Sequence, residues 1–369
     1  MTALKSFASL MGSKVFQKIV GFGSLIVYAK LFDTEQIGFI ALYGIYAELI
    51  LVISTLGLQP YILKIIPQSK EQQKEVEIIL NVCSLTIFVG SVIGSFVIYY
   101  YDFVGLSISS HIVFSLGMLV QAYYAIASQI AVSLQKYKNI SLIGISGSIQ
   151  LLILMTVLGI NLSTDGIVIA LALNSWLLAL YQVMFLPRNR GINISIKEYV
   201  EKIQSILRES SVYYIDSILM YLKRQGDQLL VKELIGMDSL GLYYLAKRFS
   251  ENVFVITSSM DQIATPKLSK YFAQDRAKFE LHVKTMSTLT VSVAIITFII
   301  FYGFIDIYAL VIDKTDEYFK FLVTVLLIRP SVDIVRNVFV GRLVFLAAPA
   351  RFRLFMTALE TFCLFLSIY

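Results

Sequence analysis

The chain has 369 residues, of which 57% are hydrophobic and 15% are charged, and its mean hydropathy is +0.76. A soluble protein of this length needs a more charged surface to stay dissolved, so the composition excludes a soluble globular protein and indicates a membrane protein. The net charge of +6 does not point to nucleic acid as a partner, because the basic residues gather in alternate loops between apolar segments.

Apolar segments follow one another along the chain, most of them near the length of about 20 residues that crosses a bilayer as a helix. They lie at about 7–29, 38–59, 78–99, 112–134, 140–160, 166–186, 211–231, 240–263, 285–305, 319–340 and from 354 to the C-terminus. The first has no small-residue cleavage pattern behind it, so we interpret it as a spanning helix rather than a signal peptide. The sequence predicts an all-α, polytopic membrane protein with about 11 spans.

Lysine and arginine are distributed unevenly between the two sides of these spans. With the N-terminus in the cytoplasm, the loops on that side hold 19 of them and the opposite loops hold three. Because positively charged loops stay in the cytoplasm, this asymmetry predicts a cytoplasmic N-terminus.

The longest cytoplasmic connection, 188–209, divides the chain. Ile196, Val200, Ile203 and Leu207 recur there at helical spacing among charges, which predicts an amphipathic linker helix on the membrane surface. The linker separates an N-terminal unit of six spans, at 1–187, from a C-terminal unit of about five, at 210–369.

The two units resemble each other in sequence. Leu31, Ile37, Gly38, Glu48, Gln59 and Lys64 recur 203 residues later as Leu234, Leu240, Gly241, Glu251, Gln262 and Lys267. An offset that repeats a Glu, a Gln and a Lys indicates an internal duplication, and six spans per copy make the repeat parallel. A complete second copy would extend beyond Tyr369, so we expect the second unit to be truncated at its C-terminus.

The seventh predicted span carries several charged residues. Asp216, Lys223 and Asp227 are separated by 7 and 4 positions and fall on one helix face, which Arg224 and Gln228 widen into a polar stripe. Charges inside spans usually face a protein interior or a water-filled cavity. The alternative is a self-neutralising Lys223–Asp227 pair that simply lets the helix pack.

Charged residues also lie inside the first and eighth spans. Lys14 and Lys18 share a face of the first span without an acidic partner there, so they are predicted either to bind an anion or to snorkel to the interface. In the eighth span, Lys247 or Arg248 can pair with Glu251.

The second and tenth spans extend this pattern. Glu48, the only acid of the second span, is predicted to be a proton or ion site or to pair with a lysine of the first helix. Arg329, Asp333 and Arg336 lie on one face of the tenth span.

Together these residues predict a central cavity with a surplus of cations, which suits an anionic substrate with a lipid tail. The predicted substrate-binding residues are Lys14, Lys18, Lys223, Arg224, Arg248, Arg329 and Arg336. The predicted ion-coupling candidates are Glu48, Asp216, Asp227, Glu251 and Asp333. Lipid-linked diphosphate sugars fit such a cavity, since cations can engage the diphosphate.

No catalytic residue, cofactor or metal site is predicted. The sequence lacks a G-x-x-x-x-G-K-[ST] loop, and His111 and His282 are isolated from other ligand types. Cys83 and Cys363 fall within apolar runs, which does not favour a disulfide or a zinc site.

Two stretches related by the repeat carry a resemblance to a known family. They are Ala-Lys-Leu-Phe-Asp-Thr-Glu-Gln-Ile-Gly-Phe-Ile-Ala-Leu-Tyr at 29–43 and Leu-Ile-Gly-Met-Asp-Ser-Leu-Gly-Leu-Tyr-Tyr-Leu-Ala-Lys-Arg at 234–248. With the span pattern, they resemble Wzx-type O-antigen and polysaccharide flippases of the multidrug/oligosaccharidyl-lipid/polysaccharide (MOP) exporter superfamily.

This resemblance implies two six-helix lobes around a central cavity, alternating access, and undecaprenyl-diphosphate oligosaccharide as the cargo. It also implies coupling to a proton or sodium gradient and a place in the bacterial inner membrane. Membrane lipids, a polysaccharide polymerase and a chain-length regulator are the implied partners.

Three alternatives stay open from the sequence. A cation-coupled multidrug exporter of the same superfamily would be expected to present acids to a cationic cargo. A membrane enzyme such as a polysaccharide polymerase normally carries a large outer loop, which this chain lacks, so we do not predict an enzyme. A truncated flippase that no longer transports is the third alternative.

The predicted orientation can be tested with phosphatase fusions, because the reporter enzyme is active only outside the cytoplasm. A fusion after Tyr101 is expected to be active and one after Gln204 inactive. The opposite pattern would overturn the predicted orientation.

Overall fold

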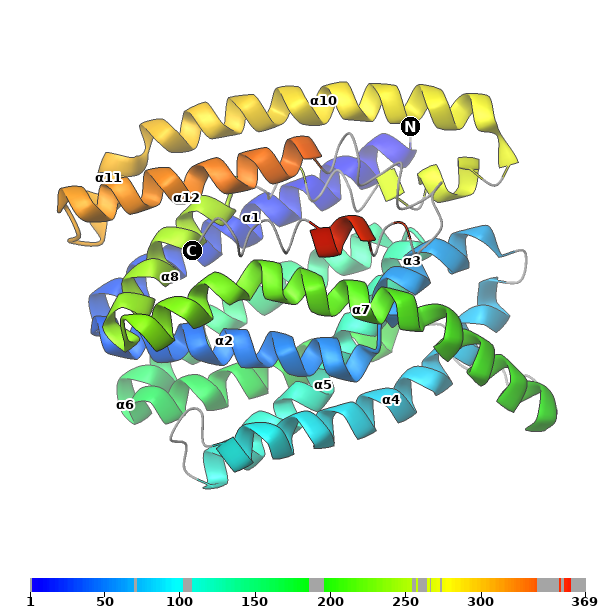
Figure 1. The fold of residues 1–369 in the computed structure, drawn as a ribbon, viewed down its shortest axis with the longest axis horizontal. Helices are drawn as coiled ribbons and strands as arrows, with labels where there is room; N and C mark the ends of the chain where they lie inside the picture. The colour runs from blue at the N-terminus through cyan, green and yellow to red at the C-terminus, as the bar shows by residue number, and fades with distance from the viewer. Residues whose placement is uncertain are drawn as a thin grey trace.

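The computed structural model describes residues 2–69, 72–101, 108–185, 196–253, 257, 264–265, 267–272, 274–336, 352 and 355–359. Its elements there are α-helices that run roughly parallel to the long axis of the molecule (Figure 1). Those of the first half are α1 (Thr2–Leu31), α2 (Thr34–Thr55), α3 (Leu58–Gln68), α4 (Gln72–Tyr101), α5 (Ile108–Ser133) and α6 (Tyr137–Phe185). Those of the second half are α7 (Ile196–Leu234), α8 (Met237–Glu251), α10 (Arg276–Gly303), α11 (Ile305–Val311) and α12 (Glu317–Arg336).

Length and apolarity make this a multi-pass membrane protein. Within the described residues, five helical stretches are long and apolar enough to cross a bilayer, namely Thr34–Thr55, Glu75–Phe96, Ile108–Ser133, Tyr137–Leu162 and Arg276–Gly303. A helix suits a bilayer because it satisfies its own backbone hydrogen bonds. Large apolar side chains such as Phe96, Ile299 and Phe321 lie exposed on the helices, as expected of a surface that faces lipid.

The predicted span 38–59 is wrong at its C-terminal end. Helix α2 ends at Thr55, and the chain passes through left-handed conformations at Leu56 and Gly57, with φ of 44° and 73°, before α3 begins. A side chain at Gly57 would also come within 2.6 Å of the Ser210 carbonyl oxygen of α7. Glycine suits this bend because it tolerates positive φ and allows the close approach.

Helix α6 combines the predicted spans 140–160 and 166–186 in one helical run that folds back on itself. A Cβ on Gly166 would contact the Leu158 carbonyl oxygen, and one on Gly147 would contact the side chain of Leu178. Residues so far apart in sequence cannot touch in a straight helix, which rises about 1.5 Å per residue. The two contacting pairs, Gly166 with Leu158 and Gly147 with Leu178, have nearly the same midpoint in the sequence. The chain therefore reverses near Asn161 and forms two antiparallel arms.

Other helix ends also differ from the predicted spans. Helix α7 continues from the predicted amphipathic linker into the seventh predicted span without a break. Helix α8 ends at Glu251, and residues 254–256 and 258–263 of the eighth predicted span lie outside the described residues. Of the last predicted segment, residues 355–359 are described, and they are helical.

Helix boundaries recur at the predicted offset of 203 residues. Helix α1 ends at Leu31 and α7 at Leu234, and α2 begins at Thr34 and α8 at Met237. Helices α4 and α10 overlap at this offset, and they lie at opposite edges of the molecule (Figure 1). The offset of 203 residues is therefore present in these helix ends as well as in the sequence matches.

Helices α2 and α8 meet through a reciprocal glycine contact. A Cβ on Gly38 would contact the carbonyl oxygen of Met237, and one on Gly241 would contact the carbonyl oxygen of Thr34. Met237 is the repeat counterpart of Thr34, and Gly241 is that of Gly38, so the same contact is made twice with its partners exchanged. This exchange is the signature of a two-fold relation between the helices. The Thr34 hydroxyl also donates to a carboxylate oxygen of Asp238 at 2.8 Å.

We expect one added methyl group at this contact to lower the stability of the protein. Alanine usually stabilises a helix relative to glycine, but in Gly38→Ala and Gly241→Ala the new methyl meets backbone, and such overpacking costs about 1–3 kcal/mol. The thermal midpoint of the purified protein in detergent should therefore fall. Gly303→Ala is the control, since an added Cβ there meets nothing within 4 Å. Equal midpoints in all three variants would contradict the close approach of α2 and α8.

Candidate functional site

A cavity of about 420 Å³ lies between α1, α2, α7, α8 and α12, and we call it the basic cavity. Its charged lining residues are Lys18, Glu48, Lys223, Arg224, Lys247, Arg248, Glu251, Arg329 and Asp333. Six of these are basic and three are acidic. All of them except Lys247 were predicted as site residues from their positions inside apolar spans.

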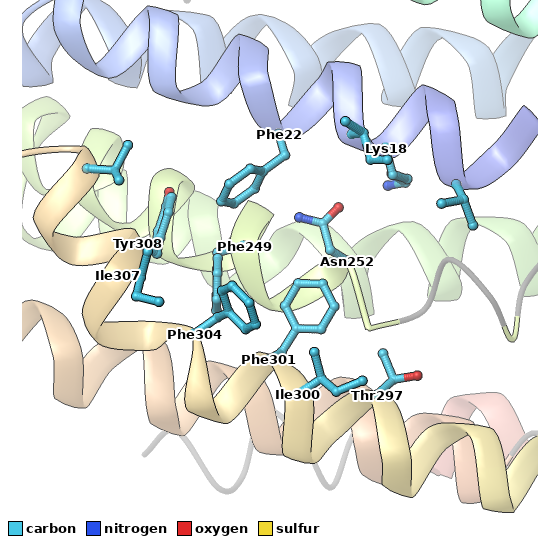
Figure 2. A pocket seen from close by; sticks show the side chains of 13 residues that line it. Lys18, Phe22, Phe249, Asn252, Thr297, Ile300, Phe301, Phe304, Ile307 and Tyr308 are labelled. Atoms are coloured by element: carbon cyan, nitrogen blue, oxygen red, sulfur yellow. The ribbon is translucent and has the colours of Figure 1, made fainter.

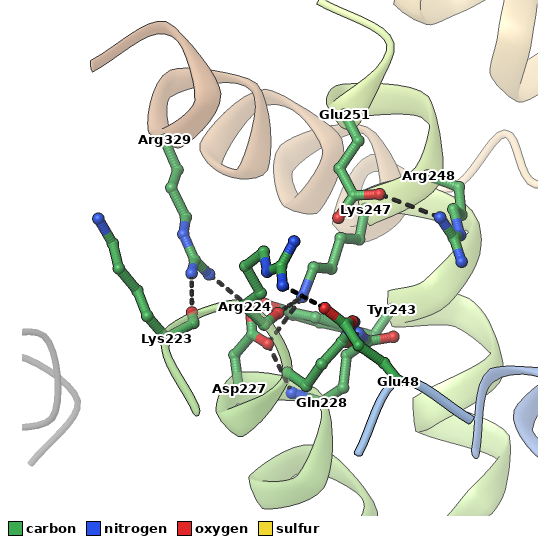
Figure 3. Close-up of polar contacts among 11 residues, drawn as sticks. Glu48, Lys223, Arg224, Asp227, Gln228, Tyr243, Lys247, Arg248, Glu251 and Arg329 are labelled. Carbon is green, nitrogen blue, oxygen red and sulfur yellow. Dashed lines mark hydrogen bonds and ion pairs between the residues drawn. The ribbon is translucent and has the colours of Figure 1, made fainter. Parts of the chain in front are cut away.

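The most buried carboxylate beside the cavity is that of Asp227 on α7, with a side chain 11% exposed. Its two oxygens accept hydrogen bonds from the Lys247 ammonium at 2.8 Å, the Arg329 guanidinium at 2.5 Å and the Tyr243 hydroxyl at 2.9 Å. Figure 3 shows these groups converging from α7, α8 and α12. One carboxylate thus links three helices and is shared by two cations.

The alternative of a self-neutralising Lys223–Asp227 pair is not what the structure shows, since Lys223 lines the basic cavity, as was predicted. Lys223 instead pairs with Asp333 of α12, with its Nζ atom 2.9 Å from the carboxylate oxygen. The reason is that Lys247 and Arg329 already surround Asp227, so Lys223 turns to the next carboxylate on α12. The seventh span is therefore neutralised by other helices rather than by itself.

Glu48 of α2 forms an ion pair with Arg224 of α7, and it also accepts a hydrogen bond from the Gln225 side chain. This cationic partner belongs to the seventh span, whereas one of the two sequence-based alternatives paired Glu48 with a lysine of the first helix. The Arg224 side chain is 56% exposed, so the guanidinium is open to the cavity while it pairs with Glu48.

Arg248 and Glu251 of α8 form the predicted pair, at 3.3 Å between nitrogen and oxygen. The guanidinium of Arg248 also lies 5.0 Å from the ring centre of Tyr244, a cation–π arrangement. The guanidinium of Arg248 also lies beside Gly44 of α2, since a Cβ on that glycine would be 4.0 Å from an Nη atom.

The remaining predicted site residues lie elsewhere or cannot be placed. Asp216 is buried away from the basic cavity and accepts a hydrogen bond from the Thr357 hydroxyl at 2.6 Å, which ties α7 to the helical residues 355–359. The side chains of Lys14 and Arg336 lie outside the described residues. In the described parts of the chain, no group of three or more His, Cys, Asp or Glu is placed to hold a metal ion.

The sequence was compared with known families and structures. Residues 3–272 match the family model of polysaccharide biosynthesis proteins. The chain belongs to the polysaccharide biosynthesis protein family. No curated protein gives a significant match to this polysaccharide biosynthesis protein.

Solved structures with the same fold are membrane transporters. A point mutant of the MATE transporter VcmN of Vibrio cholerae superposes with a TM-score of 0.71 at 13% identity, covering 99% of this chain and 89% of that one. An outward-facing multidrug resistance MATE transporter of the MOP superfamily gives 0.71 at 14% identity, with 98% and 85% covered. A MOP superfamily transporter from Pyrococcus furiosus, for which a reversed binding-pocket polarity suggests a different function, gives 0.70 at 14% identity, with 98% and 85% covered. The fold of this chain is therefore that of these membrane transporters.

The shared carboxylate makes a prediction about stability. Asp227→Asn should strongly destabilise the protein, because it leaves Lys247 and Arg329 buried without their counter-charge, a loss of about 3–5 kcal/mol for a buried pair. Thermal unfolding of the purified protein measures the loss, and adding Arg329→Gln to Asp227→Asn should restore part of it.

The control for this prediction is an exposed pair on the same helix. Glu233→Gln breaks the ion pair between Lys232 and Glu233, and such surface pairs contribute about 0–1 kcal/mol. Equal stability of Asp227→Asn and Glu233→Gln would show that Asp227 does not hold the three helices together.

Proposed function

We propose that this protein is a flippase that moves an undecaprenyl-diphosphate-linked oligosaccharide from the cytoplasmic to the outer leaflet of the bacterial inner membrane. The cargo would then enter the assembly of a surface polysaccharide such as O-antigen or capsule. The observation that carries this proposal is the surplus of cations in the basic cavity. Membership of the polysaccharide biosynthesis protein family supports the class of cargo.

The charges favour an anion as the ligand of the cavity. Six basic and three acidic side chains line it. Asp227 does not line the cavity but pairs with Lys247, which does, and so counts as a fourth acid. Among the described residues, the basic side chains at the cavity thus outnumber the acidic ones by two. Such a surplus attracts an anion, and a diphosphate can bridge several cations at once.

The reciprocal glycine contact supports loading from the cytoplasm. The α1–α2 and α7–α8 turns lie next to it, and the loop charges predict that both turns face the outside. Contact between α2 and α8 at their N-terminal ends would thus close the outer side of the basic cavity. Transport would require this contact to open, as alternating access between two repeats demands.

In this proposal, the acidic residues at the cavity couple transport to the binding of a proton or sodium ion. Glu48, Asp227, Glu251 and Asp333 each pair with a cation at the cavity. A diphosphate that competes for those cations would free a carboxylate, which could then take up a proton or sodium ion. Asp216 lies away from the basic cavity and has no part in this route. A polysaccharide polymerase and a chain-length regulator are the protein partners that such a flippase would serve.

The second candidate is a cation-coupled multidrug exporter, favoured by the likeness to MATE transporters. A cationic drug would meet more cations than carboxylates in the basic cavity, which is the reason we place this candidate second. A deletion strain separates the two: the flippase predicts lipid-linked oligosaccharide trapped on the cytoplasmic leaflet, whereas the exporter predicts drug sensitivity without trapping.

Arg224 is the cation best suited to test the cargo, because its guanidinium is open to the cavity. In the deletion strain, Arg224→Glu should fail to clear the trapped precursor, while the amount of protein in the membrane stays at the wild-type level. Loss of even one charge-assisted hydrogen bond, worth about 1.5–3 kcal/mol, would slow transport at least about tenfold.

Lys232→Glu is the matched control, since Lys232 lies on the same helix but outside the basic cavity. It should restore normal surface polysaccharide. Normal clearance by Arg224→Glu would remove Arg224 from the cargo site and weaken the anion-binding proposal.

A further inference from the structure

A second cavity, of about 410 Å³, lies beside the basic cavity, and we call it the apolar pocket. It is lined by residues of α1, α10, α11 and the C-terminal end of α8, and Figure 2 shows aromatic side chains gathered in it. Phe249 and Tyr308 form its buried floor, with their rings stacked at 4.4 Å between centroids. Phe22 and Phe301 pack against this floor at 5.4 Å.

The polar groups of the apolar pocket are mostly engaged with backbone. The Asn252 amide donates to the Arg248 carbonyl at 3.0 Å, the Thr297 hydroxyl to the Val293 carbonyl at 2.7 Å, and the Tyr308 hydroxyl to the Leu245 carbonyl at 3.0 Å. A hydrocarbon ligand would therefore leave none of these donors without a partner.

Lys18 is shared by the two cavities: it lines the basic cavity on one side and the apolar pocket on the other. Figure 2 shows it extending from α1 beside Asn252, at the edge of the apolar pocket. A cation at the junction of a basic cavity and an apolar pocket matches a molecule in which a phosphate joins a polar head to a hydrocarbon chain. The apolar pocket is also open to the bilayer, since the large side chains of Ile19, Ile300 and Phe304 on its rim are exposed.

We propose that the apolar pocket binds the first units of the prenyl chain of a lipid-diphosphate cargo while the diphosphate lies at Lys18 and the head group occupies the basic cavity. This inference rests on the proposed function and adds a site for the tail. With the N-terminus in the cytoplasm, the apolar pocket runs from Lys18 at mid-depth towards the outer ends of α10 and α11. The tail then lies on the outer side of the head, which is the orientation of a lipid in the cytoplasmic leaflet. The apolar pocket is thus a loading site, used before the cargo turns over.

The test compares two neighbouring residues of α10. Ile300 lines the apolar pocket and is 51% exposed, whereas Ile299 does not line it and is 63% exposed. The substitution Ile300→Trp should fill the pocket, and Ile299→Trp should place the same bulk in lipid. Ile19→Trp fills the pocket from the opposite wall, on α1, and serves as a second variant if the first does not fold.

The measurement is equilibrium binding of farnesyl diphosphate and of inorganic pyrophosphate to the purified full-length chain in phosphatidylcholine nanodiscs, with empty nanodiscs as the blank. The wild-type protein should bind farnesyl diphosphate at least about tenfold more tightly than pyrophosphate, since burial of even two methylene groups yields that factor. Ile300→Trp and Ile19→Trp should lose this gain and keep the affinity for pyrophosphate. Ile299→Trp should keep both, and Lys18→Gln should weaken both.

The outcomes separate the tail site from the proposed function. A gain that persists in Ile300→Trp and Ile19→Trp would place the tail elsewhere and overturn this inference while leaving the flippase proposal intact. Displacement of farnesyl diphosphate by phosphatidylglycerol as effectively as by itself would mean that the apolar pocket holds ordinary bilayer lipid, which also overturns the inference. Binding of neither diphosphate would overturn the proposed function and the tail site together.

Discussion

Asp227 of α7 holds Lys247 of α8 and Arg329 of α12 in one buried ion-paired cluster, and the arrangement of these three helices depends on it. A charge inside a membrane protein is costly unless it is paired and hydrogen-bonded. Helix α12 must therefore stay close enough to α7 for its arginine to reach the carboxylate. The second contact between the same helices, from Lys223 to Asp333, reinforces this distance. The basic cavity lies where these charges join the three helices, while apolar side chains such as Phe249 and Leu327 pack α8 against α12 beside it.

The duplicated helices have diverged in chemistry while keeping their geometry. Their boundaries agree at an offset of 203 residues, and α2 and α8 exchange equivalent glycine contacts. The charges do not repeat in the same way, because the cations of α7 at Lys223 and Arg224 correspond to Val20 and Gly21 of α1. A symmetric frame thus encloses an asymmetric site. Such asymmetry suits a cargo with a charged head on one side and a tail on the other.

The basic cavity and the apolar pocket place a charged and an apolar environment side by side in one helix bundle. The basic cavity offers cations whose attraction for phosphate is strengthened by the low dielectric around them. The apolar pocket offers aromatic and aliphatic surface whose polar groups are engaged with backbone. Lys18 lies where the two meet, since it lines both of them.

The sequence by itself determined the class of fold, because apolar segments in lipid must satisfy their own backbone as helices. It also indicated most of the charged residues that line the basic cavity, because charges inside such segments are rare and costly. It also determined the duplication, through the spacing of residues such as Gly38 and Gly241. Only the tertiary structure decided which charges pair, since a long basic side chain reaches neighbouring helices whose distance no spacing along the chain reveals. Lys223 therefore binds Asp333, 110 positions away, rather than Asp227 one helical turn away on its own helix.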